Sequence, residues 1–213
     1  MKLSYEDKSQ ILKRLPNLKL PYENIHKKVL SELYYIIPKG KKHLVWFTYI
    51  KDKKVCIFIE INPGSKKMIK NLFVVPQTFN KKIVLGTVFY GTLIESKDKK
   101  LFSIESIHFY KGKNIEEQNE LFKLNLIKDI LSSEIKQIII GRNGIGIGLP
   151  VITGSFEESI SVAKQLPYTV YSIQNRNLNN NTNKFNSTLY KNYKFYSFGA
   201  AFEVIKPLLL FLI

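Results

Sequence analysis

The sequence predicts an α+β fold built mainly from antiparallel sheets flanked by helices. Several runs of β-branched and aromatic residues are separated by short polar turns, which is typical of consecutive antiparallel strands. Other segments carry apolar residues at three- and four-residue spacing, which favours amphipathic helices. The chain has 213 residues, of which 45% are hydrophobic. This is enough for one domain with an added flank and too apolar for wholesale disorder.

Residues 1–35 are expected to form a helical N-terminal flank. Two segments, 5–15 and 22–35, show helical spacing of their apolar residues. Pro16 and Pro21 lie between them, where proline separates helices because it cannot continue one.

The α+β domain is expected over residues 36–213. The segments that we expect to be strands are 44–50, 55–61, 69–76, 83–94, 101–110, 135–140, 168–174 and 194–206. The longest helix is expected at 114–131, with Leu121, Leu124, Ile127 and Leu131 on one face. A second helix, running to about Leu166, is expected to start at Ser155, because Ser155 and Glu158 fit a capping box. The Asn-rich stretch 175–192 is predicted to be a mobile loop.

A glycine-rich loop over residues 141–148 allows two interpretations. Its backbone amides could contact a phosphate, or it could be an ordinary turn-rich loop. We favour the ordinary loop, because the segment lacks the Lys-Ser/Thr ending of a P-loop and no helix follows it directly.

The sequence predicts no metal site and no disulfide framework. The single cysteine, Cys56, lies in an apolar run and is expected to be a buried core residue. His26, His43 and His108 share no metal-binding spacing and are expected to have ordinary surface or core roles.

The balance of charges indicates a polyanionic partner. Lys and Arg number 33 and Asp and Glu 17, which gives a formal net charge of +16. Such an excess favours nucleic acid or nucleotide phosphates. If the partner is a nucleic acid, we expect RNA more than DNA. Many of the lysines lie in short runs within predicted turns: 39–42, 51–54, 66–67, 81–82 and 97–100. They are either ordinary solvated turns or, if the turns share one face, a surface that follows a phosphate backbone.

The chain shows no signal peptide and no stretch of 18 apolar residues, so we expect no membrane span and an intracellular, cytoplasmic protein. The apolar segment 207–213 is expected to be a final strand or a docking segment for a protein partner.

The order of several segments is informative. They are Pro38-Lys39-Gly40-Lys41-Lys42-His43, Gly86 to Ile94, Leu101 to Ile115, Leu166 to Arg176, and Phe202 to Pro207. This succession resembles the nucleotidyltransferase domain shared by mRNA capping guanylyltransferases and ATP-dependent polynucleotide ligases, in particular divergent members from large DNA viruses. The resemblance implies that fold, here without an OB domain. It also adds a virion or a viral factory as an alternative location.

The resemblance places Lys39 at the position of the family lysine, which attacks the nucleotide α-phosphate. The Asp, Gly and Arg of the family motif are replaced here by Lys41, Lys42 and Leu44. Lys39 is therefore a candidate catalytic position in a motif that is otherwise lost.

The later motifs are degenerate as well. Tyr90 and Thr92 replace the two carboxylates of the family's Asp-Gly-Glu strand, and Tyr171 stands at the next acidic position. Glu105 is retained, and Lys206 is the remaining candidate for the last motif's lysines. Because magnesium is held by carboxylates, we expect a pseudoenzyme that has lost nucleotidyl transfer and has no cofactor. Magnesium is expected only if the protein is active, as an mRNA guanylyltransferase.

The favoured hypothesis is a degenerate nucleotidyltransferase-like protein that binds RNA or nucleotide phosphates in viral mRNA capping or transcription. One alternative is a cap-binding module similar to that of snurportin, in which Trp46 would stack on the cap. Another is a structural or polymerase-associated viral subunit. The candidate binding residues are Lys39, Lys41, Lys42, Trp46, Thr92, Glu105, Arg176 and Lys206.

Overall fold

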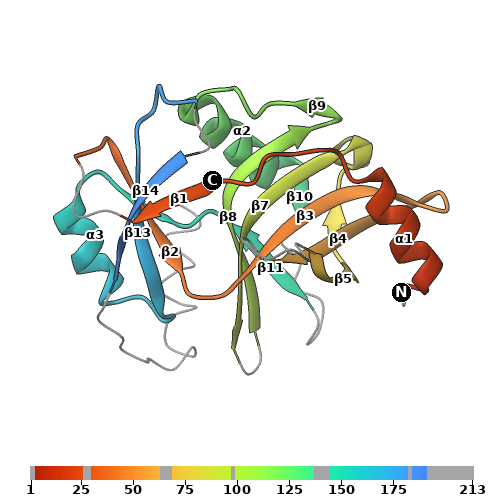
Figure 1. Ribbon diagram of the computed structural model, residues 1–213, viewed down its shortest axis with the longest axis horizontal. Helices are drawn as coiled ribbons and strands as arrows, with labels where there is room; N and C mark the ends of the chain where they lie inside the picture. The colour runs from red at the N-terminus through yellow and green to blue at the C-terminus, as the bar shows by residue number, and fades with distance from the viewer. Residues whose placement is uncertain are drawn as a thin grey trace.

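The computed structural model describes residues 3–25, 30–62, 69–96, 99–136, 144–181 and 184–190. Over these residues the chain forms two sheets that lie side by side, each with helices against it (Figure 1). The α+β class with mainly antiparallel pairing is therefore confirmed.

The large sheet has the strand order β11-β8-β7-β3-β4-β5, and β9 pairs with the outer part of β8. Its strands are β3 (Lys41–Ile50), β4 (Lys53–Ile61), β5 (Ile69–Val75), β7 (Thr87–Ser96), β8 (Lys99–Tyr110), β9 (Lys113–Asn114) and β11 (Ile145–Gly148). All pairs are antiparallel except β11 with β8. The hairpins β3–β4 and β7–β8 lie where the sequence predicts strand pairs.

The small sheet has the order β1-β14-β13-β2-β12. Its strands are β1 (Tyr22–Ile25), β2 (Leu33–Pro38), β12 (Val151–Thr153), β13 (Val170–Arg176) and β14 (Lys184–Leu189). The edge strand β1 runs parallel to β14, and the other pairs are antiparallel. A separate two-stranded ladder joins β6 (Thr78–Phe79) to β10 (Ile135–Lys136). The short 3-10 helix η1 is Ile83–Leu85.

Three helices cover the sheets: α1 (Tyr5–Arg14), α2 (Glu120–Ser133) and α3 (Phe156–Ala163). Successive side chains of β3 point to opposite faces of the large sheet, and each face packs against a different hydrophobic core. Val45 and Phe47 belong to the core that contains the apolar residues of α2, whereas Leu44 and Trp46 belong to the core with Ile11 of α1. A third core lies between the small sheet and α3.

The helix expected over residues 22–35 is wrong. Residues 22–25 form β1 and residues 33–38 form β2, so among the described residues of the flank only α1 is helical. The run Leu33 to Ile37 is aromatic and β-branched, and it is buried between β12 and β13. Sheet pairing therefore decides the structure of a segment whose apolar spacing also fits a helix.

The remaining helix expectations are confirmed with shorter bounds. α2 begins at Glu120, not at residue 114, because the Asn119 side chain accepts a hydrogen bond from Phe122 N and caps the helix there. Leu121 is exposed, contrary to the expected apolar face. Ser155 caps α3 as predicted, although Glu158 turns back to Gly154 N. α3 ends at Ala163, short of the expected end.

Two expected loops contain strands. Residues 145–148 of the glycine-rich segment form the buried strand β11 beside β8; residues 141–143 lie outside the described part. The Asn-rich segment contains the end of β13 and all of β14, so the prediction of a loop over 175–192 is wrong there. The expected strand 194–206, with Lys206, and the apolar segment 207–213 also lie outside the described residues.

Candidate functional site: a polar network between the two sheets

Glu105, Lys42 and Thr92 meet on the face of the large sheet that carries α1. Lys42 Nζ donates to both oxygens of Glu105 at 2.7 Å, and Thr92 Oγ1 donates to Glu105 Oε1 at 2.5 Å. Lys42 and Thr92 are direct partners across β3 and β7. Three of the residues selected from the sequence are thus brought together.

A β-bulge directs Glu105 into this cluster. Tyr90 pairs with Ser106 and Gly91 pairs with Ile104, so Glu105 is an extra residue in β8. The bulge brings the two backbones very close at Gly91. A Cβ there would lie 2.0 Å from the carbonyl oxygen of Ser103, so this position requires glycine.

Glu23 of β1 extends the cluster towards the small sheet. Its carboxylate lies 4.0 Å from Lys42 Nζ and accepts a 2.9 Å hydrogen bond from Gln174 Nε2 of β13. Burial raises the pKa of Glu23, with Lys42 acting in the opposite direction. Through Glu23, the N-terminal strand connects the two sheets.

Arg176 of β13 is the best-supported member of the network. Its guanidinium carbon lies 4.0 Å from the ring centroids of Tyr35 and Phe185. Nη1 donates to Glu120 Oε1 at 2.7 Å, and Nε donates to Gln174 Oε1 at 2.8 Å. The Tyr35 hydroxyl donates to the same oxygen of Glu120 at 2.7 Å.

The charged groups of the network pair with one another. Burial alone would lower the pKa of Arg176, but Glu120 beside it raises that pKa. Burial raises the pKa of Tyr35 well above its usual value, with the Glu120 charge adding to the effect. The network contains two cations, Lys42 and Arg176, and three carboxylates, Glu23, Glu105 and Glu120. Its cations are already paired, so it offers little positive potential to an incoming triphosphate.

Three other residues selected from the sequence, Lys39, Lys41 and Trp46, lie apart from this network. Lys39 and Lys41 are exposed at the connection between β2 and β3, where Lys39 N donates to Thr169 O. Trp46 is only 4% exposed and packs in the core under α1, with the Arg14 guanidinium 5.9 Å from its ring centroid.

The two tyrosines at the family's acidic positions have different environments. Tyr90 is buried, with Lys42 Nζ 5.5 Å from its ring centroid, and burial raises the pKa of its hydroxyl. Tyr171 is an extra residue in β13, because Val170 pairs with Pro38 and Ser172 with Ile37, and its side chain is exposed. Among the described residues, no group of three or more His, Cys, Asp or Glu side chains could hold a metal ion.

Four members of the network, Glu23, Tyr35, Glu120 and Gln174, were not predicted from the sequence. Period-two alternation of Ser172, Gln174 and Arg176 was a usable signal, because it marks one polar face of a strand. Glu120 had no local signal, since it enters the network only through the placement of α2 against the small sheet.

A second buried cluster lies next to the network. His108 is the extra residue of another bulge in β8, since Val88 pairs with Phe109 and Phe89 with Ile107. His108 Nδ1 lies 2.9 Å from Glu116 Oε1, which also accepts a 3.0 Å hydrogen bond from Lys19 N. Lys123 Nζ donates to Glu116 O at 2.6 Å. These bonds fix the chain segment before α2 against the N-terminal segment.

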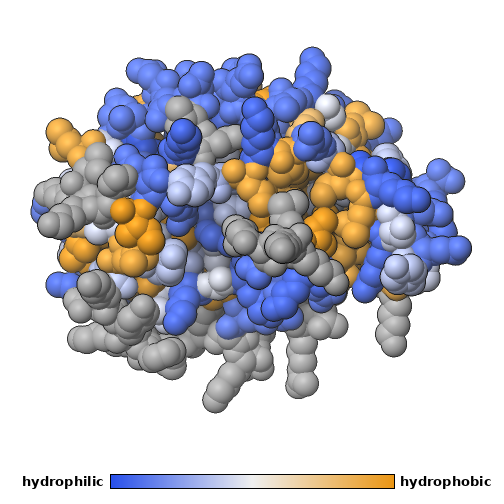
Figure 2. Space-filling model, viewed as in Figure 1, coloured by the Kyte–Doolittle hydropathy of each residue, from blue (hydrophilic) through white to orange (hydrophobic). Residues whose placement is uncertain are grey.

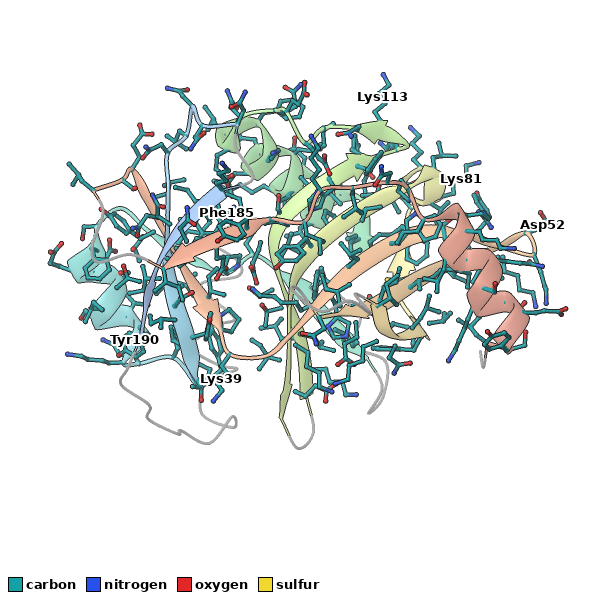
Figure 3. The ribbon with its side chains drawn as sticks, in the orientation of Figure 1. Lys39, Asp52, Lys81, Lys113, Phe185 and Tyr190 are labelled. Carbon is teal, nitrogen blue, oxygen red and sulfur yellow. The ribbon has the colours of Figure 1, made fainter. Side chains whose placement is uncertain are left out.

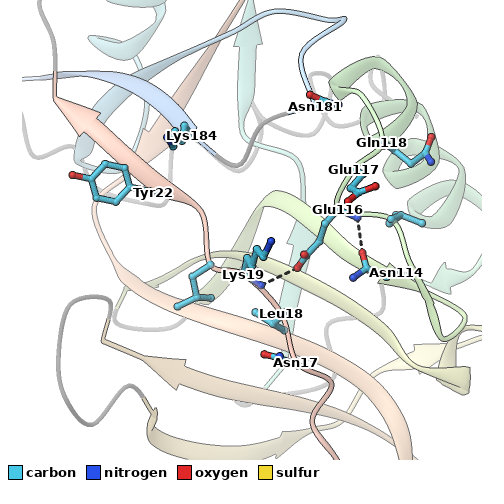
Figure 4. A pocket seen from close by; sticks show the side chains of 12 residues that line it. Asn17, Leu18, Lys19, Tyr22, Asn114, Glu116, Glu117, Gln118, Asn181 and Lys184 are labelled. Atoms are coloured by element: carbon cyan, nitrogen blue, oxygen red, sulfur yellow. Dashed lines mark hydrogen bonds between the residues drawn. The ribbon is translucent and has the colours of Figure 1, made fainter.

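A pocket of about 920 Å³ opens beside this cluster (Figure 4). Residues 17–22, residues 114–118 and two residues near β14 form its walls. The lining residues are Asn17, Leu18, Lys19, Leu20, Tyr22, Asn114, Ile115, Glu116, Glu117, Gln118, Asn181 and Lys184.

The lysine-bearing turns do not all share one face. Lys81 and Lys113 lie along the upper edge of the molecule, Lys39 lies at the lower edge, and Asp52 marks the β3–β4 turn at the far right (Figure 3). The turns of Lys81 and Lys113 adjoin, because Gly112 N donates to Gly86 O at 3.3 Å. Hydrophilic residues cover the upper edge over α2 and β9 (Figure 2).

Neither a protein-family model nor a curated protein matches this chain. Within the described part of the chain, none of the helices has the length and apolar character needed to cross a bilayer. Fold and site together define an α+β protein with two adjoining, mainly antiparallel sheets and a network of paired charges between them.

Proposed function

We propose that this protein is a catalytically degenerate nucleotidyltransferase-like protein that binds RNA or nucleotide phosphates, in viral mRNA capping or transcription. The observation that carries the proposal is the internal pairing of Lys42 and Arg176 with Glu105, Glu23 and Glu120. A nucleotide-transfer site needs unpaired cations and metal-binding carboxylates around the phosphates. Here the charges pair with one another instead, and the 4.0 Å approach of Lys42 Nζ to the Glu23 carboxylate links the large sheet to the small one.

The polyanion-binding part of the proposal rests on the excess of positive charge. The network carries three carboxylates and two cations, so it supplies none of the positive excess behind the net charge of +16. The excess must lie elsewhere, and Lys81, Lys82 and Lys113 are exposed on adjoining turns. Exposed lysines that follow a phosphate backbone release counterions on binding, which gives a strongly salt-dependent affinity.

The buried position of Trp46 favours this function over cap binding. Stacking on a methylated cap needs an open aromatic face, and that face of Trp46 is covered by α1 and Arg14.

Two measurements test the proposal. First, the protein is incubated with magnesium and labelled GTP or ATP, and no covalent lysine–nucleotide adduct is expected; an adduct that disappears in Lys39→Ala would overturn the loss of catalysis. Second, RNA affinity is measured as a function of salt. A flat salt dependence or no binding contradicts the polyanion-binding function.

The second measurement has a matched control. Lys81→Glu with Lys113→Glu is expected to weaken RNA binding and reduce the salt slope by about 2, because each lysine that no longer neutralises a phosphate lowers the slope by about 1. Lys53→Glu with Lys54→Glu makes the same charge change on the exposed β3–β4 hairpin and is expected to have the smaller effect.

A further inference from the structure

The pocket between the N-terminal segment and the start of α2 is preformed. Its floor is held by the Lys19 N and His108 bonds to Glu116 and by Glu116 N, which donates to Asn114 Oδ1 at 2.8 Å. Lys123 Nζ donates a hydrogen bond to the backbone carbonyl of Glu116. A volume of about 920 Å³ lies at the upper end of the range for ligand sites.

The lining chemistry suits a nucleobase better than a phosphate. Lys19 and Lys184 are balanced by Glu116 and Glu117, so the pocket has no net positive charge to attract an anion. Carboxamides are abundant instead, and they hydrogen-bond to base edges as both donors and acceptors. The carboxamide residues of the lining are Asn17, Asn114, Gln118 and Asn181.

Tyr22 supplies an aromatic surface at the rim. Its side chain is 63% exposed although its backbone is fixed by pairing with Lys184 in β14. An exposed ring on a fixed strand can stack on a base without reorganisation. Figure 4 shows Tyr22 and Lys184 on one side of the pocket and Glu117 and Gln118 on the other.

We propose that this pocket binds an unpaired base of single-stranded RNA, stacked on Tyr22 and hydrogen-bonded by the carboxamide side chains. The inference deepens the proposed function and rests on it. Asn114 in the pocket wall directly follows Lys113 in β9. An RNA strand bound along Lys81 and Lys113 would therefore pass close to the pocket. An unstacked base is available only in single-stranded RNA, because bases in a duplex are paired and stacked.

The experiment compares two labelled ten-nucleotide strands that differ only in their bases. One is a mixed-sequence RNA and the other is its abasic counterpart with the same phosphates. The wild-type protein is expected to prefer the strand with bases. Tyr22→Ala should weaken binding of that strand by about 5- to 150-fold, the range for loss of one stacked base, and leave the abasic strand unaffected. Gln118→Ala should reduce the same preference.

Two controls make the result specific. Tyr22→Phe keeps the ring and is expected to keep the preference for bases. Tyr5→Ala removes another exposed tyrosine, 89% exposed on α1, and is expected to change nothing. Circular dichroism of each variant verifies that it is folded.

The contrary outcomes separate the two proposals. Equal affinity of the wild type for both strands, or an unchanged preference in Tyr22→Ala, overturns the base pocket while salt-dependent binding upholds the proposed function. No binding of either strand overturns both.

Discussion

Removing the Arg176 side chain tests whether the network holds the sheets together. Arg176 and Glu120 are 4% and 6% exposed, so water screens their 2.7 Å ion pair very little. Arg176→Met keeps an apolar chain between the two aromatic rings but removes the ion-pair partner of the buried Glu120 carboxylate. Breaking a buried pair in this way costs about 3–5 kcal/mol. The Tyr35 hydroxyl still donates to Glu120, so we expect a value near the lower limit, about 3 kcal/mol.

Guanidinium unfolding followed by circular dichroism measures this cost. A thermal melt should show a decrease in Tm of about 6–12 °C for a chain of this length. The double variant Arg176→Met, Glu120→Gln removes the uncompensated charge and keeps an acceptor for Tyr35. It is therefore expected to be more stable than Arg176→Met by about 1 kcal/mol or more. Lys100→Met, which breaks the exposed 3.6 Å pair with Glu95, should cost less than about 1 kcal/mol. The reasoning is refuted if Arg176→Met costs no more than Lys100→Met, or if the double variant shows simple additivity.

Three further predictions concern single positions. Gly91→Ala places a Cβ 2.0 Å from a backbone oxygen and should strongly lower the melting temperature. Gly154→Ala, with open space around the added Cβ, should not. Equal melting temperatures of the two variants would contradict the close approach. Burial raises the pKa of Glu23 above its ordinary 4.5, so the folded state binds this proton more tightly than the unfolded state does. The resulting contribution to stability is present below pH 4.5 and is lost as the pH rises through the folded-state pKa. Glu23→Gln should accordingly be more favourable, relative to wild type, at pH 8 than at pH 4 in urea titrations, and a difference that does not vary with pH argues against it. Cys56 is fully buried and burial raises the pKa of its thiol, so a thiol reagent should label it only in denaturant; rapid labelling of the native protein would be the contrary result.

The fold class follows from the sequence wherever local pattern and tertiary pairing agree. The β3–β4 hairpin and α1 are examples, because their turns, caps and alternation depend on adjacent residues. β1 and β2 could not be predicted in this way, since apolar spacing over residues 22–35 also fits a helix and the choice depends on strands more than a hundred residues away. β14 is similar, because Asn186 lies in a strand only through the pairing of β14 with β1 and β13.

The candidate site was predictable in part. Lys42, Thr92 and Glu105 were selected through the family resemblance and prove to be bonded to one another. Their geometry depends on a bulge at Glu105, and a bulge shifts a strand by one residue without a marker in the sequence. Glu120 was not predictable, because its role arises from contact between a helix and a remote strand.

The pairing of β1 with β14 also sets an order of assembly. Tyr22 pairs with Lys184 and Leu33 with Arg176, so the small sheet closes loops of well over a hundred residues. Loop closure of that length slows folding, and on the ribosome β1 finds its neighbour only after β14 has been synthesised. The large sheet, built mostly from hairpins, can form earlier and serve as the template on which β1 and β14 meet.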